Sequence, residues 1–207
     1  MKRRRLLFVL IPIGILAALV VLYLGNSRSN YESPRYAIES KNGNFEIRQY
    51  EPFEVVSTSM DGAGRNGSFG RLFRYISGSN DGGQKIAMTT PVFMPASREG
   101  KMEEMQFVLP KSVAESGAPE PNAREVALKK DAGGRYAVLR FKGRLGGEEL
   151  RAKMKELRGM LKAMEIEADG EPVFAGYDPP WTPGFLRRNE VLIPLPPART
   201  EVAADRH

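Results

Sequence analysis

The chain has 207 residues, of which 42% are hydrophobic and 27% charged, and this composition is typical of one folded domain with its own core. It contains no cysteine, and its one histidine lies at position 207, in a tail (196–207) that we expect to be disordered. This inventory argues against disulfides, thiolate metal sites and histidine catalysis. The formal net charge of +6 comes largely from four basic residues within positions 1–5, so it does not predict a nucleic-acid interface.

Residues 6–24 form an apolar run of 19 residues, interrupted only by Pro12 and Gly14 and preceded by the basic residues within 1–5. Such a run is long enough to cross a bilayer as a helix, and a basic flank favours a cytoplasmic N-terminus. A cleavable signal peptide is the alternative, although its apolar region is usually shorter and no clear small-x-small cleavage site follows. We therefore expect an uncleaved transmembrane signal-anchor, a polar linker over 25–35, and a single-pass membrane protein whose folded domain is periplasmic or extracellular.

The first half of the folded region begins with alternating apolar and polar residues over 45–60, which predicts a strand broken at Pro52. A glycine-rich joint over 62–67 follows, and then a short helix over 69–76. The apolar stripe of this helix, at helical spacing, is expected to consist of Phe69, Leu72, Phe73 and Ile76.

The glycine-rich joint over 62–67 matches the pattern G-x-G-x-x-G, and Asp81 follows about twenty residues on, as in a dinucleotide-binding loop. The strand before such a loop belongs to a parallel sheet and is almost continuously apolar, whereas Ser57, Thr58 and Ser59 are polar. Dinucleotide binding is therefore the weaker interpretation, and a parallel sheet would revive it.

Residues 85–95 combine β-branched side chains with Pro91 and Pro95. Because β-branched residues favour an extended backbone and proline cannot donate to a ladder, we predict an edge or barrel-rim strand that is apolar on both faces. Such a run fits either a buried strand or a strand that contacts a ligand. It is expected to form a hairpin with a second strand over 102–109.

The second half of the chain repeats this order, with strands, a glycine-rich joint, a longer helix and a strand pair at residues 126–142, 143–147, 150–164 and 173–195. The apolar stripe of the longer helix is Leu150, Met154, Leu157, Leu161 and Met164. Two β-α-β-β units in the same order predict an internal duplication. The expected fold is α+β: a distorted antiparallel barrel with two flanking helices, preceded by one N-terminal transmembrane helix.

Two motifs of this sequence resemble the signature of the SOUL haem-binding protein family. The first is SNDG at 79–82 followed by KIAMTTPV at 85–92. The second is GYDPPWTP at 176–183 followed by RRNEV at 187–191. Both occur in the family's order, and the likeness covers residues 36–195. The resemblance implies two pseudo-repeated units in a distorted barrel that binds haem or another porphyrin noncovalently on a shallow apolar surface, and it implies no reaction.

Carried over to this sequence, the resemblance predicts a ligand-contacting region on the first helix, on the 85–88 stretch and on the loop that follows Tyr177. The candidate cofactor-binding residues are Phe73, Arg74, Lys85, Met88, Tyr177, Trp181 and Arg188. Met88, Phe73 and Trp181 are expected to cover the porphyrin face, with cations near the propionates. Family members proposed to bind the iron through histidine have no counterpart within the matched range, which leaves Met88, Tyr177 and a few other Met and Tyr residues as candidate iron ligands. We assign no metal site, and since the sequence offers no set of base, nucleophile and electrophile, we predict no catalytic residue.

Two features leave alternatives open. The proline-stiffened loop over 178–185 with Trp181 fits either a ligand contact or a lid on the barrel end. Glu190 is the carboxylate that we expect to be buried if any is, in an ion pair with Arg187 or Arg188. A second hypothesis makes the barrel a binder or hydrolase of other apolar small molecules, as in related domains of bacterial multidrug-sensing regulators, and a third makes it a partner-binding module. A carboxylate ring deep inside the barrel would favour the second hypothesis.

Overall fold

The computed structural model describes residues 31–62, 64–144, 146–168, 170–179 and 182–198. The chain divides into two compact units, Met1–Tyr31 and Glu32–His207, and all described helices and strands belong to the second. The predicted membrane span lies outside the described residues, as does most of the predicted tail. Within the described ranges, no helix is long and apolar enough to cross a membrane.

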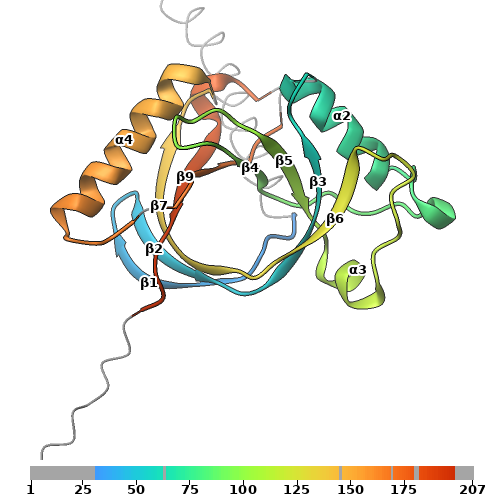
Figure 1. Ribbon diagram of the computed structural model, residues 1–207, viewed down its shortest axis with the longest axis horizontal. Coiled ribbons are helices and arrows are strands. Elements are labelled where there is room, and N and C mark those ends of the chain that lie inside the picture. The colour runs from blue at the N-terminus through green and yellow to red at the C-terminus, as the bar shows by residue number, and fades with distance from the viewer. Residues whose placement is uncertain (1–30, 63, 145, 169, 180–181, 199–207) are drawn as a thin grey trace, which may run out of the picture. The chain divides into compact units, whose positions relative to one another are not determined.

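The strands of the second unit form one nine-stranded antiparallel sheet that curls into a half-barrel (Figure 1). In chain order the strands are β1 (Tyr36–Asn42), β2 (Phe45–Tyr50), β3 (Phe53–Ser59), β4 (Val92–Pro95), β5 (Glu104–Val108), β6 (Val126–Asp131), β7 (Gly134–Lys142), β8 (Val173–Gly176) and β9 (Arg188–Pro194). Their order across the sheet is β1-β2-β7-β9-β8-β4-β5-β3-β6. Because neighbouring strands pair antiparallel, the sheet lacks the parallel context that a dinucleotide-binding loop requires.

The two halves of the chain occupy corresponding places in this sheet. In the first half β3 leads into helix α2 (Gly64–Ile76) and then into β4 and β5, and in the second half β7 leads into α4 (Gly147–Ala163) and then into β8 and β9. From the outside of the sheet toward its middle, the strands of the first half follow the order β3-β5-β4 and those of the second half the order β7-β9-β8. The two halves meet where β4 pairs with β8. This is the strand order that an internal duplication predicts.

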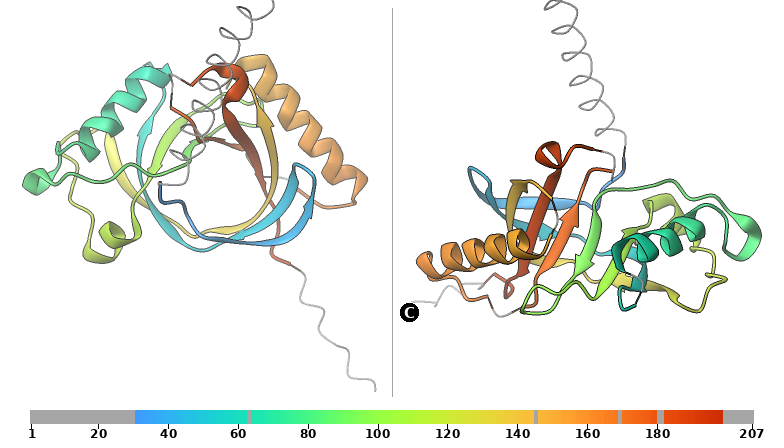
Figure 2. Two further views of the ribbon diagram at one scale, coloured as in Figure 1. Left: turned by 180° about the vertical axis from the view of Figure 1, so that it is seen from behind. Right: turned by 90° about the horizontal axis from the view of Figure 1, so that it is seen from above.

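Helices α2 and α4 lie on the outer, convex face of the sheet (Figures 1 and 2). The predicted stripe of α4 is confirmed for Leu150, Met154, Leu157 and Leu161, which are all buried, whereas Met164 lies beyond the helix end and is exposed. A third short helix, α3 (Lys111–Ser116), lies between β5 and β6 and was not expected.

The predicted stripe of α2 was partly wrong. The helix buries Ser68, Leu72, Tyr75 and Ile76, while Phe73 is 50% exposed. Tyr75 can be buried because its hydroxyl donates to the carbonyl of Pro119 at 2.8 Å, and Ser68 because its hydroxyl donates to the carbonyl of Ser59 at 3.1 Å. These polar-tipped residues turn the helix so that Phe73 faces outward.

The strand expected over 85–95 is much shorter in the structure, because only Val92–Pro95 pairs and it lies in the middle of the sheet, between β8 and β5. Residues 85–89 form neither strand nor helix and are held by individual hydrogen bonds, such as the 2.6 Å bond from the Thr89 hydroxyl to the carbonyl of Val108. Pro91 has no N–H for a ladder, so pairing begins after it. The edge-strand prediction is therefore wrong, and the buried-strand interpretation holds for β4.

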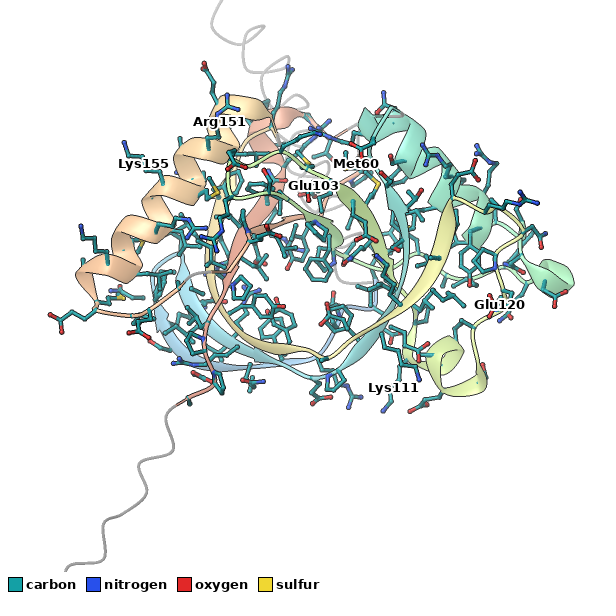
Figure 3. All side chains as sticks on the ribbon, in the orientation of Figure 1. Met60, Glu103, Lys111, Glu120, Arg151 and Lys155 are labelled. Carbon is teal, nitrogen blue, oxygen red and sulfur yellow. The ribbon has the colours of Figure 1, made fainter. Side chains whose placement is uncertain are left out.

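The sheet has an apolar cluster on each face. The convex cluster contains the buried residues of α2 and α4, and alternate strand residues such as Met94, Phe107 and Val191. The concave cluster lies inside the curled sheet and contains Tyr50, Val55, Phe93, Val108, Val138, Ala175 and Leu192. Figure 3 shows side chains pointing into this inner space. The sheet therefore has two opposite apolar faces.

Candidate functional site

A groove of about 390 Å³ lies on the convex face, between the start of α2 and the segment that leads into β9. Its apolar surface comes from α2 and the central strands, and its polar rim from the start of α2 and from the ends of β8 and β9. We call it the convex groove, and it is lined by Arg65, Asn66, Phe69, Val92, Met94, Met105, Gly176, Asp178, Arg187 and Asn189. Antiparallel pairing positions these strand residues, because Val92 lies opposite Gly176 and Gly176 opposite Asn189.

Two arginines on the rim of the convex groove come from different halves of the chain. Arg65 lies in the first turn of α2 and Arg187 directly before β9. Partial burial lowers the pKa of Arg65, and the positive charge of Arg187 lowers it further, so the two cations lie close enough to repel each other. The Nε–H of Arg187 donates to the carbonyl of Thr182 at 2.8 Å, which fixes this side chain. The carboxylate of Asp178 lies on the same rim.

The groove continues as an aromatic surface along α2. Phe69 stacks on Phe73 with ring centroids 6.0 Å apart and an interplanar angle of 14°. Its other contact is an edge-on one with buried Phe107 at 5.1 Å. Because Phe73 is exposed and leans on a groove residue, it extends the apolar surface available to a flat ligand. This places one predicted site residue beside the groove.

The other predicted residues of the first half lie away from the groove lining. Arg74 borders a small hollow of about 150 Å³ together with Arg71, beside the loop that carries Pro121. Lys85 is exposed, and Met88 is half-buried against the convex cluster. The structure therefore does not gather these three residues around one cavity.

Tyr177 and Arg188 lie on the opposite, concave face. The Tyr177 ring packs against the concave cluster, its hydroxyl donates to Glu190 Oε2 at 2.7 Å, and the Arg188 guanidinium carbon lies 4.0 Å from the ring centroid. Strand alternation places Asn189, which is buried, on the side of the convex groove and turns Glu190 and Arg188 to the other side. Trp181, the remaining candidate, lies outside the described residues.

The concave face contains a buried ion-pair network around Arg48 of β2. Its guanidinium donates two hydrogen bonds of 2.9 Å to the two carboxylate oxygens of Glu190, and a third of 2.8 Å from Nε to Glu46. Arg48 is 1% exposed and Glu190 3% exposed. The expectation that Glu190 is buried is thus confirmed, but its partner is Arg48 and not Arg187 or Arg188.

These contacts set the protonation states of the network. Burial opposes ionisation of Glu46, but the hydrogen bonds and charge of Arg48 outweigh it and lower the pKa. Burial likewise opposes the charged form of Arg48, and Glu190 outweighs it, so the pKa of Arg48 is raised. The pKa of Tyr177 is raised by burial and by the negative charge of Glu190. The bidentate contact with Arg48 balances the charge of Glu190, and this ion-pair network is not the carboxylate ring that would favour the hydrolase hypothesis.

The described residues contain no cluster of three or more histidine, cysteine, aspartate or glutamate side chains that could hold a metal ion. Sequence reasoning missed Arg65, Met94 and Met105 as groove residues. Arg65 lies within the G-x-G-x-x-G pattern, which was weighed as a dinucleotide-binding loop and not as part of a haem site. The two methionines occupy alternating positions of predicted strands, a signal that indicates burial but not which face of a central strand is open to a groove.

A family model described as SOUL heme-binding protein matches residues 31–194. The chain belongs to this family. Heme-binding protein 1 of Mus musculus is 27% identical over 151 residues, which cover 70% of this chain and 78% of that protein. Heme-binding protein 2 of the same species is 30% identical over 167 residues, which cover 75% of this chain and 80% of that protein. The family predicted from the two motifs is confirmed.

Two solved structures of low sequence identity resemble the SOUL-family fold of this chain. The EcmrR C-terminal domain has a TM-score of 0.53 and 13% identity, and covers 78% of this chain and 98% of that chain. A hydrolase from Listeria innocua has a TM-score of 0.53 and 11% identity, and covers 76% of this chain and 94% of that chain. At such identities, the likeness concerns the fold alone.

Proposed function

We propose that this chain binds haem or a related tetrapyrrole noncovalently in the convex groove, without carrying out a reaction. The observation that carries the proposal is the groove itself, an apolar strip from Phe69, Met94 and Met105 with Arg65 and Arg187 on its rim. Membership in the SOUL family supports the ligand class. A porphyrin combines a flat apolar ring with carboxylates at its edge, and this lining offers a partner to each part.

The size of the groove fits partial burial of such a ring. Its volume of about 390 Å³ lies within the range of small-molecule sites, roughly 300–1,000 Å³. Each 100 Å² of apolar ring removed from water contributes about 2.5 kcal/mol. Phe73 adds aromatic surface beside the groove. Burial of the ring, and not a bond to the metal, therefore supplies most of the binding free energy in this proposal.

Iron should matter little for affinity. Protein ligands to haem iron are typically His, Cys, Met or Tyr, and this sequence has no cysteine and one histidine, at position 207. Met88 lies outside the groove lining, and the Tyr177 hydroxyl donates to Glu190 on the concave face. We expect metal-free protoporphyrin to bind within about tenfold of haem, a difference of roughly 1.4 kcal/mol.

The test is a titration of the purified full-length chain with haem and with metal-free protoporphyrin, followed by absorbance and by porphyrin fluorescence. Deleting His207 should leave the haem spectrum unchanged. A low-spin spectrum that disappears with His207 would overturn the iron-independent binding mode. Absence of binding for both porphyrins would overturn the proposed function.

We further propose that residues 6–24 anchor the protein in a membrane, with the N-terminus in the cytoplasm and the domain on the periplasmic or extracellular side. The support is the apolar run and its basic flank. A reporter fused after His207 that is active only outside the cytoplasm is the expected result. Activity only inside the cytoplasm would refute the orientation, and a mature chain that starts near Asn26 would refute the anchor.

A further inference from the structure

A second cavity lies inside the curled sheet, on the concave face and thus on the opposite side from the convex groove. Its volume is about 70 Å³, several times the space that one water molecule needs. Four aromatic side chains and one carboxyl group dominate its lining. We call it the concave aromatic site, and it is lined by Tyr50, Phe53, Phe93, Pro95, Gln106, Asp131, Tyr136, Val173 and Leu192.

The aromatic rings of this site form a continuous wall. Tyr50 meets Tyr136 edge-on with centroids 5.6 Å apart, and Phe53 at 6.4 Å with a tilt of 56°. Phe53 in turn stacks on Phe93 at 5.8 Å. These residues come from four strands (β2, β3, β4 and β7), so the sheet fixes the wall from several directions. The rings meet one another at different angles, so the wall is not a single flat stack.

Asp131 supplies the negative group of the site. It ends β6, and one of its carboxylate oxygens accepts the N–H of Gly133 at 2.8 Å. Gly133 has a φ of +69°, and a Cβ there would collide with the backbone of Tyr50 and Glu51. The turn that carries Asp131 therefore packs closely against the backbone of these two residues. Burial raises the pKa of Asp131 and outweighs the lowering effect of the Gly133 N–H.

A larger groove of about 570 Å³ adjoins the concave aromatic site and shares Phe53 and Asp131 with it. This adjoining groove runs past the segment before β1, the start of β3 and α3. Its charged lining consists of Glu32, Glu51, Glu54, Glu115 and Asp131 against Arg35, Lys111 and Lys130. Acids thus outnumber bases by five to three, and the remaining lining includes Pro34, Pro52, Val108, Leu109 and Ala114.

We propose that the concave aromatic site binds an organic cation with an alkylated ammonium head, while an apolar body attached to that head lies in the adjoining groove. Aromatic π faces attract such a cation, and they do so best where water is excluded. Asp131 balances its charge at close range. The acidic excess of the adjoining groove attracts the same sign of ligand. A neutral ligand of equal shape would gain from the apolar contacts but not from these charges.

The test uses choline as the probe and 3,3-dimethyl-1-butanol as its uncharged counterpart of nearly equal shape. Each compound is titrated into the full-length chain, and binding is followed by the NMR signals of the tyrosine rings. Choline is expected to bind at least tenfold more tightly than the alcohol. Asp131→Asn should reduce choline binding at least tenfold and leave the alcohol unchanged, because an amide oxygen can still accept the Gly133 N–H. Asp61→Asn, at an exposed aspartate outside both cavities, is the matched control and should change neither.

Tyr136→Leu is a second variant, since it removes one ring and leaves the carboxyl group in place. It should weaken choline at least threefold relative to the alcohol. Three results would each overturn the proposal. They are equal affinity for choline and the alcohol, full choline binding by Asp131→Asn, and no choline binding up to 50 mM, a concentration that corresponds to roughly 1.8 kcal/mol at the 1 M standard state. Because the concave aromatic site and the convex groove lie on opposite faces, saturating haem should not displace choline. A failure of choline binding is therefore distinguishable from a failure of the proposed haem function.

Discussion

Replacing Arg48 with methionine is expected to cost about 3–5 kcal/mol of unfolding free energy, the range for breaking a buried ion pair by removing one partner. The guanidinium makes two hydrogen bonds to Glu190 and one to Glu46, and the Glu190 and Glu46 side chains are at most 4% exposed. Methionine fills a similar volume but leaves both carboxylates inside the sheet without their main cation. Glu46 keeps contacts of 3.2 Å to Arg140 and 3.3 Å to Lys41, so the loss of a compensating charge concerns mainly Glu190.

The size of the effect makes it easy to measure. For a chain of 150–250 residues, each kcal/mol shifts the melting temperature by about 2–4 °C, so the variant should melt roughly 6–20 °C lower. Arg48→Met/Glu190→Leu removes both charges and should cost less than the sum of its single variants, by about 0.5–3 kcal/mol of coupling. Urea unfolding followed by far-ultraviolet circular dichroism gives all three free energies.

The matched control is Arg135→Met, which breaks the ion pair with Glu39 in the same region of the sheet. This pair is 2.7 Å long, but its side chains are 21% and 31% exposed, so the expected cost is about 0–1 kcal/mol. If Arg48→Met costs no more than this control, or if the single variants add without coupling, the reasoning that the network neutralises and anchors Glu190 is refuted.

Two further predictions concern the turn between β6 and β7. Burial raises the pKa of Asp131 in the folded protein above its value in the unfolded chain. Below both pKa values the carboxyl is protonated in both states and costs no stability, but as the pH rises through them its ionisation lowers the free energy of unfolding. The stability of Asp131→Asn relative to wild type should therefore increase between pH 3 and pH 7, as measured by urea midpoints, and a difference independent of pH would contradict this. Gly133→Ala should lose at least about 1 kcal/mol more than Gly43→Ala, because both glycines have positive φ but only Gly133 lacks room for a Cβ. Equal losses in thermal unfolding would show that the backbone contact relaxes freely.

Much of the fold could be predicted because its signals are local. The i, i+4, i+7 pattern of Leu150, Met154 and Leu157 identifies α4, and alternation around Pro52 identifies β2 and β3. The strand β1 was missed because all seven of its residues are exposed, so no alternation marks it. The face of α2 was misjudged because hydrophobicity alone ranks Phe73 above Tyr75, whereas a tertiary hydrogen bond decides which one is buried.

The site was harder to predict than the fold, because neighbours along the chain point to opposite faces of a strand. Glu190 and Asn189 adjoin in sequence, yet one lies in the buried network and the other lines the convex groove. A motif therefore locates the segment but not the face. Arg48 shows the same limit, since nothing near it in sequence indicates that a residue 142 positions away is its partner.

The central claim, that a porphyrin is held in the convex groove, is tested most directly by the protoporphyrin affinity of Arg65→Ala/Arg187→Ala. We expect at least a tenfold loss, about 1.4 kcal/mol, because each charge-assisted hydrogen bond to a carboxylate contributes roughly 1.5–3 kcal/mol. The control is Arg74→Ala/Lys85→Ala, which removes the same charge from exposed positions outside the groove and should change the affinity less than threefold. A loss in the control with none in the groove variant would place the ligand elsewhere on the protein and contradict the account.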